Sequence, residues 1–261
     1  MDIYRIFTET QRQRISDGAT LPILTGCEQA ERILVLVWPQ LGDFDSLEYA
    51  WWLVRDMEAL RSHAITVRAV GIGNITSGKR FCEFTGFPTE WLFIDPDAQL
   101  HQRLGLYKGL NLKLPGFSPG QNAWLNLLLM CAGLGSPGTL KEVFRGYRGD
   151  RQAPQLIRDA EIVEDTPLPP LKGSAFNRVG KGFQRPFELA TLRLRNMSEV
   201  LGRWRTYVPD DAHLTQRGAT YLFDRQGRLL YSHRDKNILG FAENMSQPLA
   251  FLQLDDPAED G

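Results

Sequence analysis

The chain has 261 residues, of which 43% are hydrophobic and 23% charged, and its formal net charge is −1. Such a composition is typical of a globular protein with a sizeable core, and we expect no nucleic-acid partner at this net charge. The N-terminal segment MDIYRIFTETQRQR lacks the apolar stretch and cleavage site of a signal peptide. The most apolar run, residues 123–134, is too short to span a bilayer.

Strands and helices alternate over the first part of the chain. Residues 33–37 (ILVLV) form a continuous apolar run, the pattern of a strand covered on both faces. Residues 46–61 place apolar side chains at intervals of three and four, as in an amphipathic helix. This alternation predicts a parallel α/β sheet. The predicted strands cover 33–37, 65–72 and 91–94, the predicted helices cover 46–61, 77–84 and 97–104, and a turn covers 39–42.

The last part of the chain follows a different pattern. Residues 219–223 and 228–233 flank the turn sequence Asp-Arg-Gln-Gly, which predicts a β-hairpin. An amphipathic helix is predicted over 243–252, and the acidic segment 255–260 is predicted to be disordered. The proline-rich residues 166–170 predict extended backbone.

The turn before the first predicted helix carries a motif. Residues 39–46 have the sequence PQLGDFDS. Peroxiredoxins place P-x3-T-x2-C here, with the peroxide-reducing cysteine opening the helix. The chain resembles them in Pro39, but Asp43 occupies the position of the threonine and Ser46 that of the cysteine. The segment GDFDS also resembles the G-C-F-x-C motif of the peroxiredoxin-like 2 branch of the AhpC/TSA superfamily, with both cysteines replaced. Residues 86–109 are similar to the third strand and following helix of that branch.

The resemblance continues at the predicted hairpin, where residues 217–224 (RGATYLFD) are similar to R-G-x-F-x-I-D of peroxiredoxins and Arg217 takes the arginine position. It implies a thioredoxin-like fold, in which helices flank a central mixed sheet, with a long insertion before the C-terminal hairpin. We expect a single domain over 1–261, with a core of about 15–105 and 215–253 and an insertion of about 106–216. The insertion resembles that of cyanobacterial and chloroplast members, which implies a phototroph, with the thylakoid as a place of association.

The residues at the vestigial site, Pro39, Asp43, Ser46 and Arg217, do not support peroxide chemistry. A serine hydroxyl is hardly ionised at neutral pH and cannot be oxidised as a thiolate is. We expect Asp45 or Ser46 to cap the helix instead, with Glu48 completing a capping box. Two aspartates are too few to predict a metal site, and we expect no cofactor.

The three cysteines lie far apart, which argues against a disulfide framework and favours a reducing compartment, here the cytoplasm. Cys82 has Lys79 and Arg80 nearby, which favour a thiolate, and Cys27 follows Gly26 in a loop where we expect it to be exposed. Cys82 and Cys27 are therefore the candidate redox thiols. Cys131 lies in an apolar run and is expected to be buried and inert.

Residues 172–205 are strongly basic, with eight basic side chains against two acidic ones. The basic residues either pair internally with acidic neighbours such as Asp159, Glu161, Glu164 and Asp165, or they bind an anionic partner. The anion-binding candidates are Lys172, Arg178, Lys181, Arg185, Arg193 and Arg195.

Together these observations predict a protein without peroxidase activity that binds or regulates a protein partner in a redox or photosynthetic context. Two alternatives stay open. One is a divergent thiol oxidoreductase that uses Cys82 or Cys27. The other is a peripheral membrane or assembly factor that docks through residues 124–134 and the basic stretch.

Overall fold

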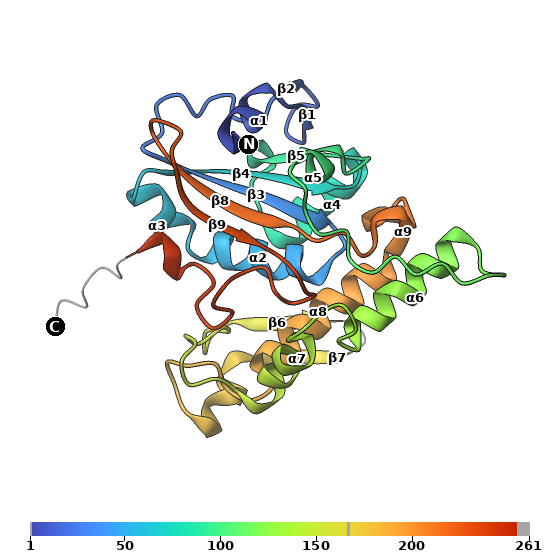
Figure 1. Ribbon diagram of the computed structural model, residues 1–261. Coiled ribbons are helices and arrows are strands. Elements are labelled where there is room, and N and C mark those ends of the chain that lie inside the picture. The colour runs from blue at the N-terminus through green and yellow to red at the C-terminus, as the bar shows by residue number, and fades with distance from the viewer. Residues whose placement is uncertain (1, 166–167, 255–261) are drawn as a thin grey trace.

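Seven strands form one mixed sheet in the computed structural model, which describes residues 2–165 and 168–254. The strand order is β2-β1-β5-β4-β3-β8-β9 (Figure 1). Strands β3, β4 and β5 run parallel, whereas β8 pairs with β3 and β9 in antiparallel fashion. The predicted α/β sheet and C-terminal hairpin are thus confirmed. The strands are β1 Gln11–Arg14, β2 Thr20–Pro22, β3 Arg32–Gln40, β4 Ile65–Ile72, β5 Leu92–Ile94, β8 Ala219–Asp224 and β9 Leu229–Arg234.

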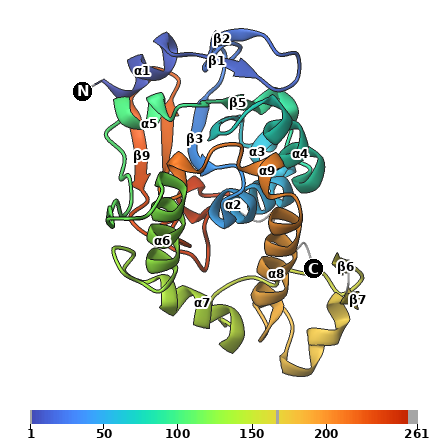
Figure 2. The same ribbon diagram turned by 90° about the vertical axis from the view of Figure 1, so that its right-hand side faces the viewer.

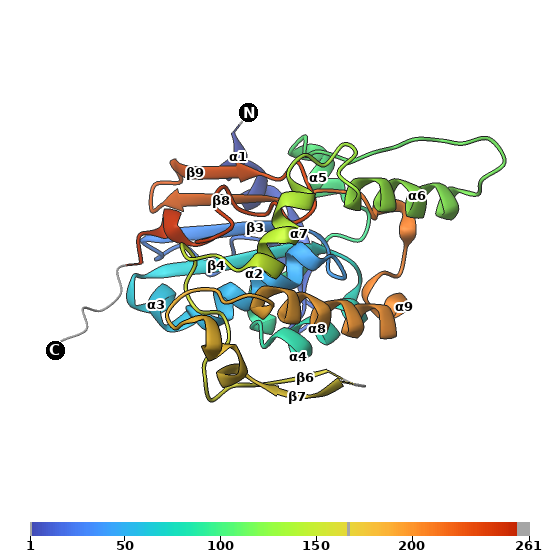
Figure 3. The same cartoon turned by 90° about the horizontal axis from the view of Figure 1, so that it is seen from below.

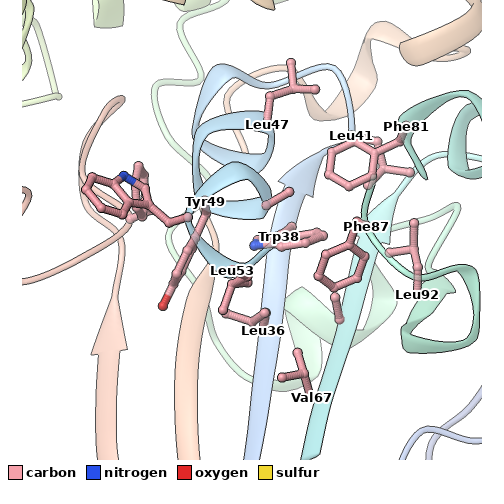
Figure 4. Close-up of a cluster of buried hydrophobic side chains, with 14 of the residues drawn as sticks. Leu36, Trp38, Leu41, Leu47, Tyr49, Leu53, Val67, Phe81, Phe87 and Leu92 are labelled. Carbon is pink, nitrogen blue, oxygen red and sulfur yellow. The ribbon is translucent and has the colours of Figure 1, made fainter. Parts of the chain in front are cut away.

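Helices cover both faces of this sheet, with α1 and α5 above it and α2 and α3 below it in Figure 1, and Figure 3 looks onto the α2 side. Alternate residues of β3 divide between two hydrophobic clusters, because successive side chains of a strand point to opposite faces. Leu36 and Trp38 belong to the cluster shared with α2 and α4, which Figure 4 shows. Val35 and Val37 belong to the cluster shared with α1 and α5. These helices are α1 Ile3–Glu9, α2 Phe44–Arg55, α3 Met57–Ser62, α4 Ile75–Thr85 and α5 Gln99–Arg103.

The elements between α5 and β8 contribute no strand to the seven-stranded sheet within the described residues. Helix α8 packs against α2, α7 and β6, and β6 pairs with β7 in a separate two-stranded sheet (Figure 2). The division into core and insertion stays a prediction of the sequence. The elements are α6 Pro119–Cys131, α7 Thr139–Arg148, β6 Ile162–Asp165, β7 Leu168–Lys172, α8 Glu188–Gly202 and α9 Trp204–Tyr207, with short 3-10 helices at Gly173–Val179 and Asp211–His213.

Several predicted boundaries were wrong. The helix expected over 46–61 is two helices, because Asp56 leaves helical geometry and caps α2 with its backbone N–H. The turn expected at 39–42 starts later, since β3 extends through Gln40. In place of a helix over 243–252 only the 3-10 turn Ala250–Leu252 forms. The side chain of Asn244 accepts a hydrogen bond from the N–H of Ser246, which favours a turn over a helix.

Other predictions fall partly or wholly outside the described residues. Strand β7 shows that the later residues of the proline-rich stretch are extended, as predicted, whereas 166–167 lie outside the described part. The acidic segment 255–260 also lies outside it. In the part of the chain that the structure describes, no helix is long and apolar enough to cross a membrane.

Candidate functional site

The motif residues 39–46 lie where β3 ends and α2 begins. Pro39 falls at a β-bulge, where the β3–β4 register shifts between Trp38 and Gln40, and a proline fits there because it has no N–H to donate. The segment before β8 passes very close to this strand end. A Cβ on Gly218 would lie 2.3 Å from the carbonyl oxygen of Val37, so only glycine allows this approach. The approach brings Arg217 to the start of α2.

Asp43 caps helix α2. Its side chain accepts a hydrogen bond of 3.0 Å from the backbone N–H of Asp45. The predicted capping box of Asp45 and Glu48 was therefore wrong, because the helix starts earlier, at Phe44. Glu48 instead accepts hydrogen bonds from the guanidinium of Arg193.

Arg217 lies fully buried against the first turn of α2, two residues before β8 begins. Its Nη1 donates to Asp45 at 3.0 Å, its Nη2 pairs with Asp43, and its Nε donates to the carbonyl of Thr215 at 3.3 Å. The other oxygen of Asp45 accepts from the backbone N–H of Leu239 at 2.7 Å. All three guanidinium nitrogens thus have partners within the protein.

A third carboxylate, Asp235, completes a buried cluster with more acidic than basic groups. Its Oδ2 accepts from the N–H of Gly218 at 3.2 Å, and its buried Oδ1 has no hydrogen-bond partner among the described residues. His233 Nε2 lies 3.7 Å from that oxygen. Burial, opposed by Arg217, raises the pKa of Asp235 to about 7. Burial and the nearby Asp43 raise the pKa of Asp45 well above its usual value, because Arg217 alone cannot neutralise three carboxylates.

Ser46 is also buried and is not positioned as a nucleophile. Its Oγ donates a hydrogen bond of 3.0 Å to the carbonyl of Gln40, at the end of β3. No described side chain forms a hydrogen bond to this hydroxyl as a base would. In the described residues no group of three or more histidine, cysteine, aspartate or glutamate side chains is arranged to hold a metal ion.

The candidate thiols Cys27 and Cys82 do not belong to the cluster around Arg217. Cys27 is buried rather than exposed, so that prediction was wrong, and burial raises its pKa. Burial, with a contribution from Glu90, raises the pKa of Cys82 to about 12. Arg80 does not activate Cys82, because it pairs with Glu199 and Glu83. Both thiols are therefore held in the neutral form.

Cys131 was expected to be buried and is instead half-buried beside the site. It lines a cavity of about 60 Å³ with Asp43, Phe44 and Ile238, among others. Burial and the charge of Asp43 raise its pKa, so it too is a poor thiolate. Its closeness to Asp43 had no local signal in the sequence, because α6 reaches the site only through the tertiary fold.

The basic stretch mostly pairs internally. Arg185 is fully buried and pairs with Glu188 and Asp159, as the alternative of internal pairing predicted. Arg193 pairs with Glu48 and Glu142. These two arginines therefore do not form part of an anion-binding surface. The other candidates lie as follows: Lys181 is 3.7 Å from Asp159, Arg195 stacks 4.3 Å from the ring centroid of Phe84, and Lys172 and Arg178 are exposed.

A cavity of about 860 Å³ lies away from Arg217, between α2, α4, α8 and strand β6. Trp51, Val54 and Phe84 line its apolar side, and Arg55, Arg195, Glu161 and Glu164 provide charges of both signs. Arg195, an anion-binding candidate, thus borders a groove whose acidic residues offset part of its charge.

The fold and the site together define a thioredoxin-like protein. Its features are a sheet with three parallel strands and a C-terminal hairpin, a helix that starts after the first parallel strand, and an arginine facing that start. A scan against known families matches residues 52–237 to the AhpC/TSA antioxidant enzyme family, to which the chain belongs. The matched segment includes Arg217 and begins after Ser46. A search of curated proteins gave no match.

We expect Asp235→Asn to change how stability depends on pH. The carboxyl of Asp235 has a pKa of about 7 in the folded protein, against about 3.9 when unfolded, so its stabilising contribution is complete below pH 4 and disappears as the pH rises through 7. The amide of the variant keeps an acceptor for the N–H of Gly218 but cannot titrate. The free energy of unfolding of the wild type, measured in urea from pH 5 to 8, should fall relative to the variant on the order of a few kcal/mol. If the free energies of unfolding of the wild type and the variant change in parallel with pH, the pKa of Asp235 is not raised.

Proposed function

We propose that this member of the AhpC/TSA family does not reduce peroxides and acts by binding or regulating a protein partner. The observation that carries the proposal is the engagement of Arg217 by Asp43 and Asp45. In the branch that the sequence resembles, cysteines stand at positions 43 and 46. Here an aspartate caps the helix at the first position and a buried serine occupies the second.

The charges support this proposal independently of the missing sulfur. A peroxide-reducing thiol needs a positive environment, because the thiolate is the reactive form. The helix start and Arg217 supply positive potential, but the guanidinium is already engaged by Asp43 and Asp45 and is not available to a thiolate. Arg217 therefore stabilises the junction of β3, α2 and β8 in place of activating a nucleophile.

The alternative of a thiol oxidoreductase has little support from Cys82 and Cys27. Both are buried, both have a raised pKa, and neither adjoins the Arg217 cluster. The binding role is supported by the region between α5 and β8, which carries most of the exposed large apolar side chains of the described chain. The resemblance to cyanobacterial and chloroplast proteins supports a redox or photosynthetic context for the partner.

The purified protein should not consume hydrogen peroxide or an organic hydroperoxide with thioredoxin or glutathione as reductant. The reason is that no described thiol has the exposure and lowered pKa that the reaction requires. Peroxide loss is followed over time against a buffer control, with the variant lacking Cys27, Cys82 and Cys131 as the matched protein control. Turnover above both controls would refute the proposal, and single cysteine variants would then identify the thiol.

A further inference from the structure

Helix α7 turns its apolar side to solvent. Leu140, Phe144 and Tyr147 are separated by four and three residues, which places them on one side of the helix. All three are exposed, Phe144 by 53% and Tyr147 by 50%. The buried side carries Glu142, which pairs with Arg145 and Arg193. This arrangement inverts the usual pattern of a surface helix, whose apolar side faces the core.

Phe187 extends the same apolar face from the start of α8. Its side chain is 59% exposed, and its ring lies 6.2 Å from that of Tyr147, nearly edge-on. Its backbone has a φ of 68°, a left-handed conformation that is unfavourable for a bulky residue. The structure holds it there through a hydrogen bond of 3.1 Å from its N–H to the carbonyl of Gly146. Such strain persists mainly where function requires it.

The exposed charged side chains of residues 139–152 are all basic. Lys141, Arg148 and Arg151 are exposed, and the guanidinium of Arg148 lies 5.8 Å from the ring centroid of Phe144. The two acidic residues between 139 and 152 do not offset them, because Glu142 is buried and Asp150 pairs with Arg145. The chain as a whole has a net charge of −1, so the positive potential is local.

We propose that the α7 surface, defined as Leu140, Phe144, Tyr147 and Phe187 with the flanking Lys141, Arg148 and Arg151, docks on an anionic lipid bilayer. Aromatic and leucine side chains next to basic ones are the composition of helices that lie in the membrane interface. The helix lies in the lower part of the molecule in Figure 2, on the opposite side from β1 and β2. The proposal does not depend on the proposed loss of peroxidase function, because none of these residues forms a hydrogen bond or ion pair with Asp43, Asp45, Arg217 or Asp235.

This surface differs from the one that the sequence suggested. Trp124 of α6 packs on Trp204 with 4.6 Å between ring centroids, and Arg185 and Arg193 are paired internally. These residues cannot reach a bilayer without breaking those contacts. The α7 surface needs no such rearrangement.

Flotation of the full chain with phosphatidylcholine vesicles, with and without phosphatidylglycerol, tests the proposal. We expect the wild type to float only with the anionic vesicles, and less so as NaCl rises from about 0.05 to about 0.5 M. The variants K141E/R148E and F144S/Y147S should each lower the bound-to-free ratio about tenfold or more. Because these side chains are exposed, the variants should keep the circular dichroism spectrum and urea midpoint of the wild type.

Two matched variants separate this surface from general charge and hydrophobicity. R61E/K79E makes the same charge change at exposed positions elsewhere, and L229S/L230S removes two exposed leucines from β9. Both should float like the wild type. Absence of flotation, equal flotation with neutral vesicles, or equal losses in all four variants would overturn the proposal. A dimer that F144S/Y147S converts to a monomer, with flotation unchanged, would show instead that the face joins two copies of this chain.

Discussion

Replacing Arg217 with methionine should lower the free energy of unfolding by about 3–5 kcal/mol, the effect of leaving buried charges without their partner. Asp43, Asp45 and Asp235 would remain as buried acidic groups with no compensating cation. The loss should be smaller at pH 5 than at pH 8, because the carboxyls can take up protons at the lower pH. Urea unfolding followed by circular dichroism at both pH values measures the loss.

Arg228→Met provides the control for this experiment. Arg228 pairs with Asp224 within the hairpin, but its side chain is 77% exposed, so its removal should cost no more than about 1 kcal/mol. The triple variant D43N/D45N/R217M should recover part of the stability lost in R217M. If R217M and R228M unfold at the same urea concentration, the buried cluster does not stabilise the junction of β3, α2 and β8.

Arg193→Met should have an effect of similar size, about 3–5 kcal/mol, because it too leaves a buried carboxylate without its partner. The guanidinium binds both oxygens of Glu48 on α2, at 2.7 and 3.0 Å, and Oε1 of Glu142 on α7 at 2.7 Å. It therefore connects three helices, and its loss leaves Glu48 buried with no cation. Urea unfolding of the variant measures the effect.

The double variant E48L/R193M shows whether the loss in R193M comes from the unpaired carboxylate of Glu48 or from the lost packing of the Arg193 side chain. Removing both members of the pair should restore much of the stability, because no buried carboxylate is left unpaired. Arg203→Met, which removes a half-exposed partner of Glu199, should change the free energy of unfolding by less than about 1 kcal/mol. If the loss in E48L/R193M equals the sum of the losses in E48L and R193M, then Arg193 and Glu48 act independently.

The parallel strands and the hairpin could be predicted because each carries a local pattern. Residues 33–37 read as a doubly covered strand, and β3 divides its side chains between two clusters as that pattern requires. Strands β1 and β2 were not predicted, since QRQR and TLP have neither the length nor the alternation of a buried strand. Strand β1 forms by pairing with β5, and β2 forms by pairing with β1, which no local signal reveals.

At the site, the positions could be predicted but their partners could not. The resemblance placed Arg217 opposite the start of α2, and the acidic residues at 43 and 45 were a charge signal for pairing with it. Asp235 and Cys131 reach the cluster only through the tertiary fold. The same holds for Arg193 and Glu48, which are 145 residues apart in sequence. Only the folded structure shows that most basic side chains of residues 172–205 pair with acidic side chains of the same protein.

The pairing of β3 with β8 has a consequence for synthesis of the chain. Val37 lies opposite Ala219, so β3 has no partner on that side until the ribosome has made the 182 residues that follow Val37 up to Ala219 (219 − 37 = 182). At 5–20 residues per second, this apolar strand edge stays open for roughly ten to forty seconds. An unpaired edge of such composition is a template for aggregation. Heterologous expression should therefore be most sensitive to temperature and chaperone supply during translation, more than to the stability of the finished fold.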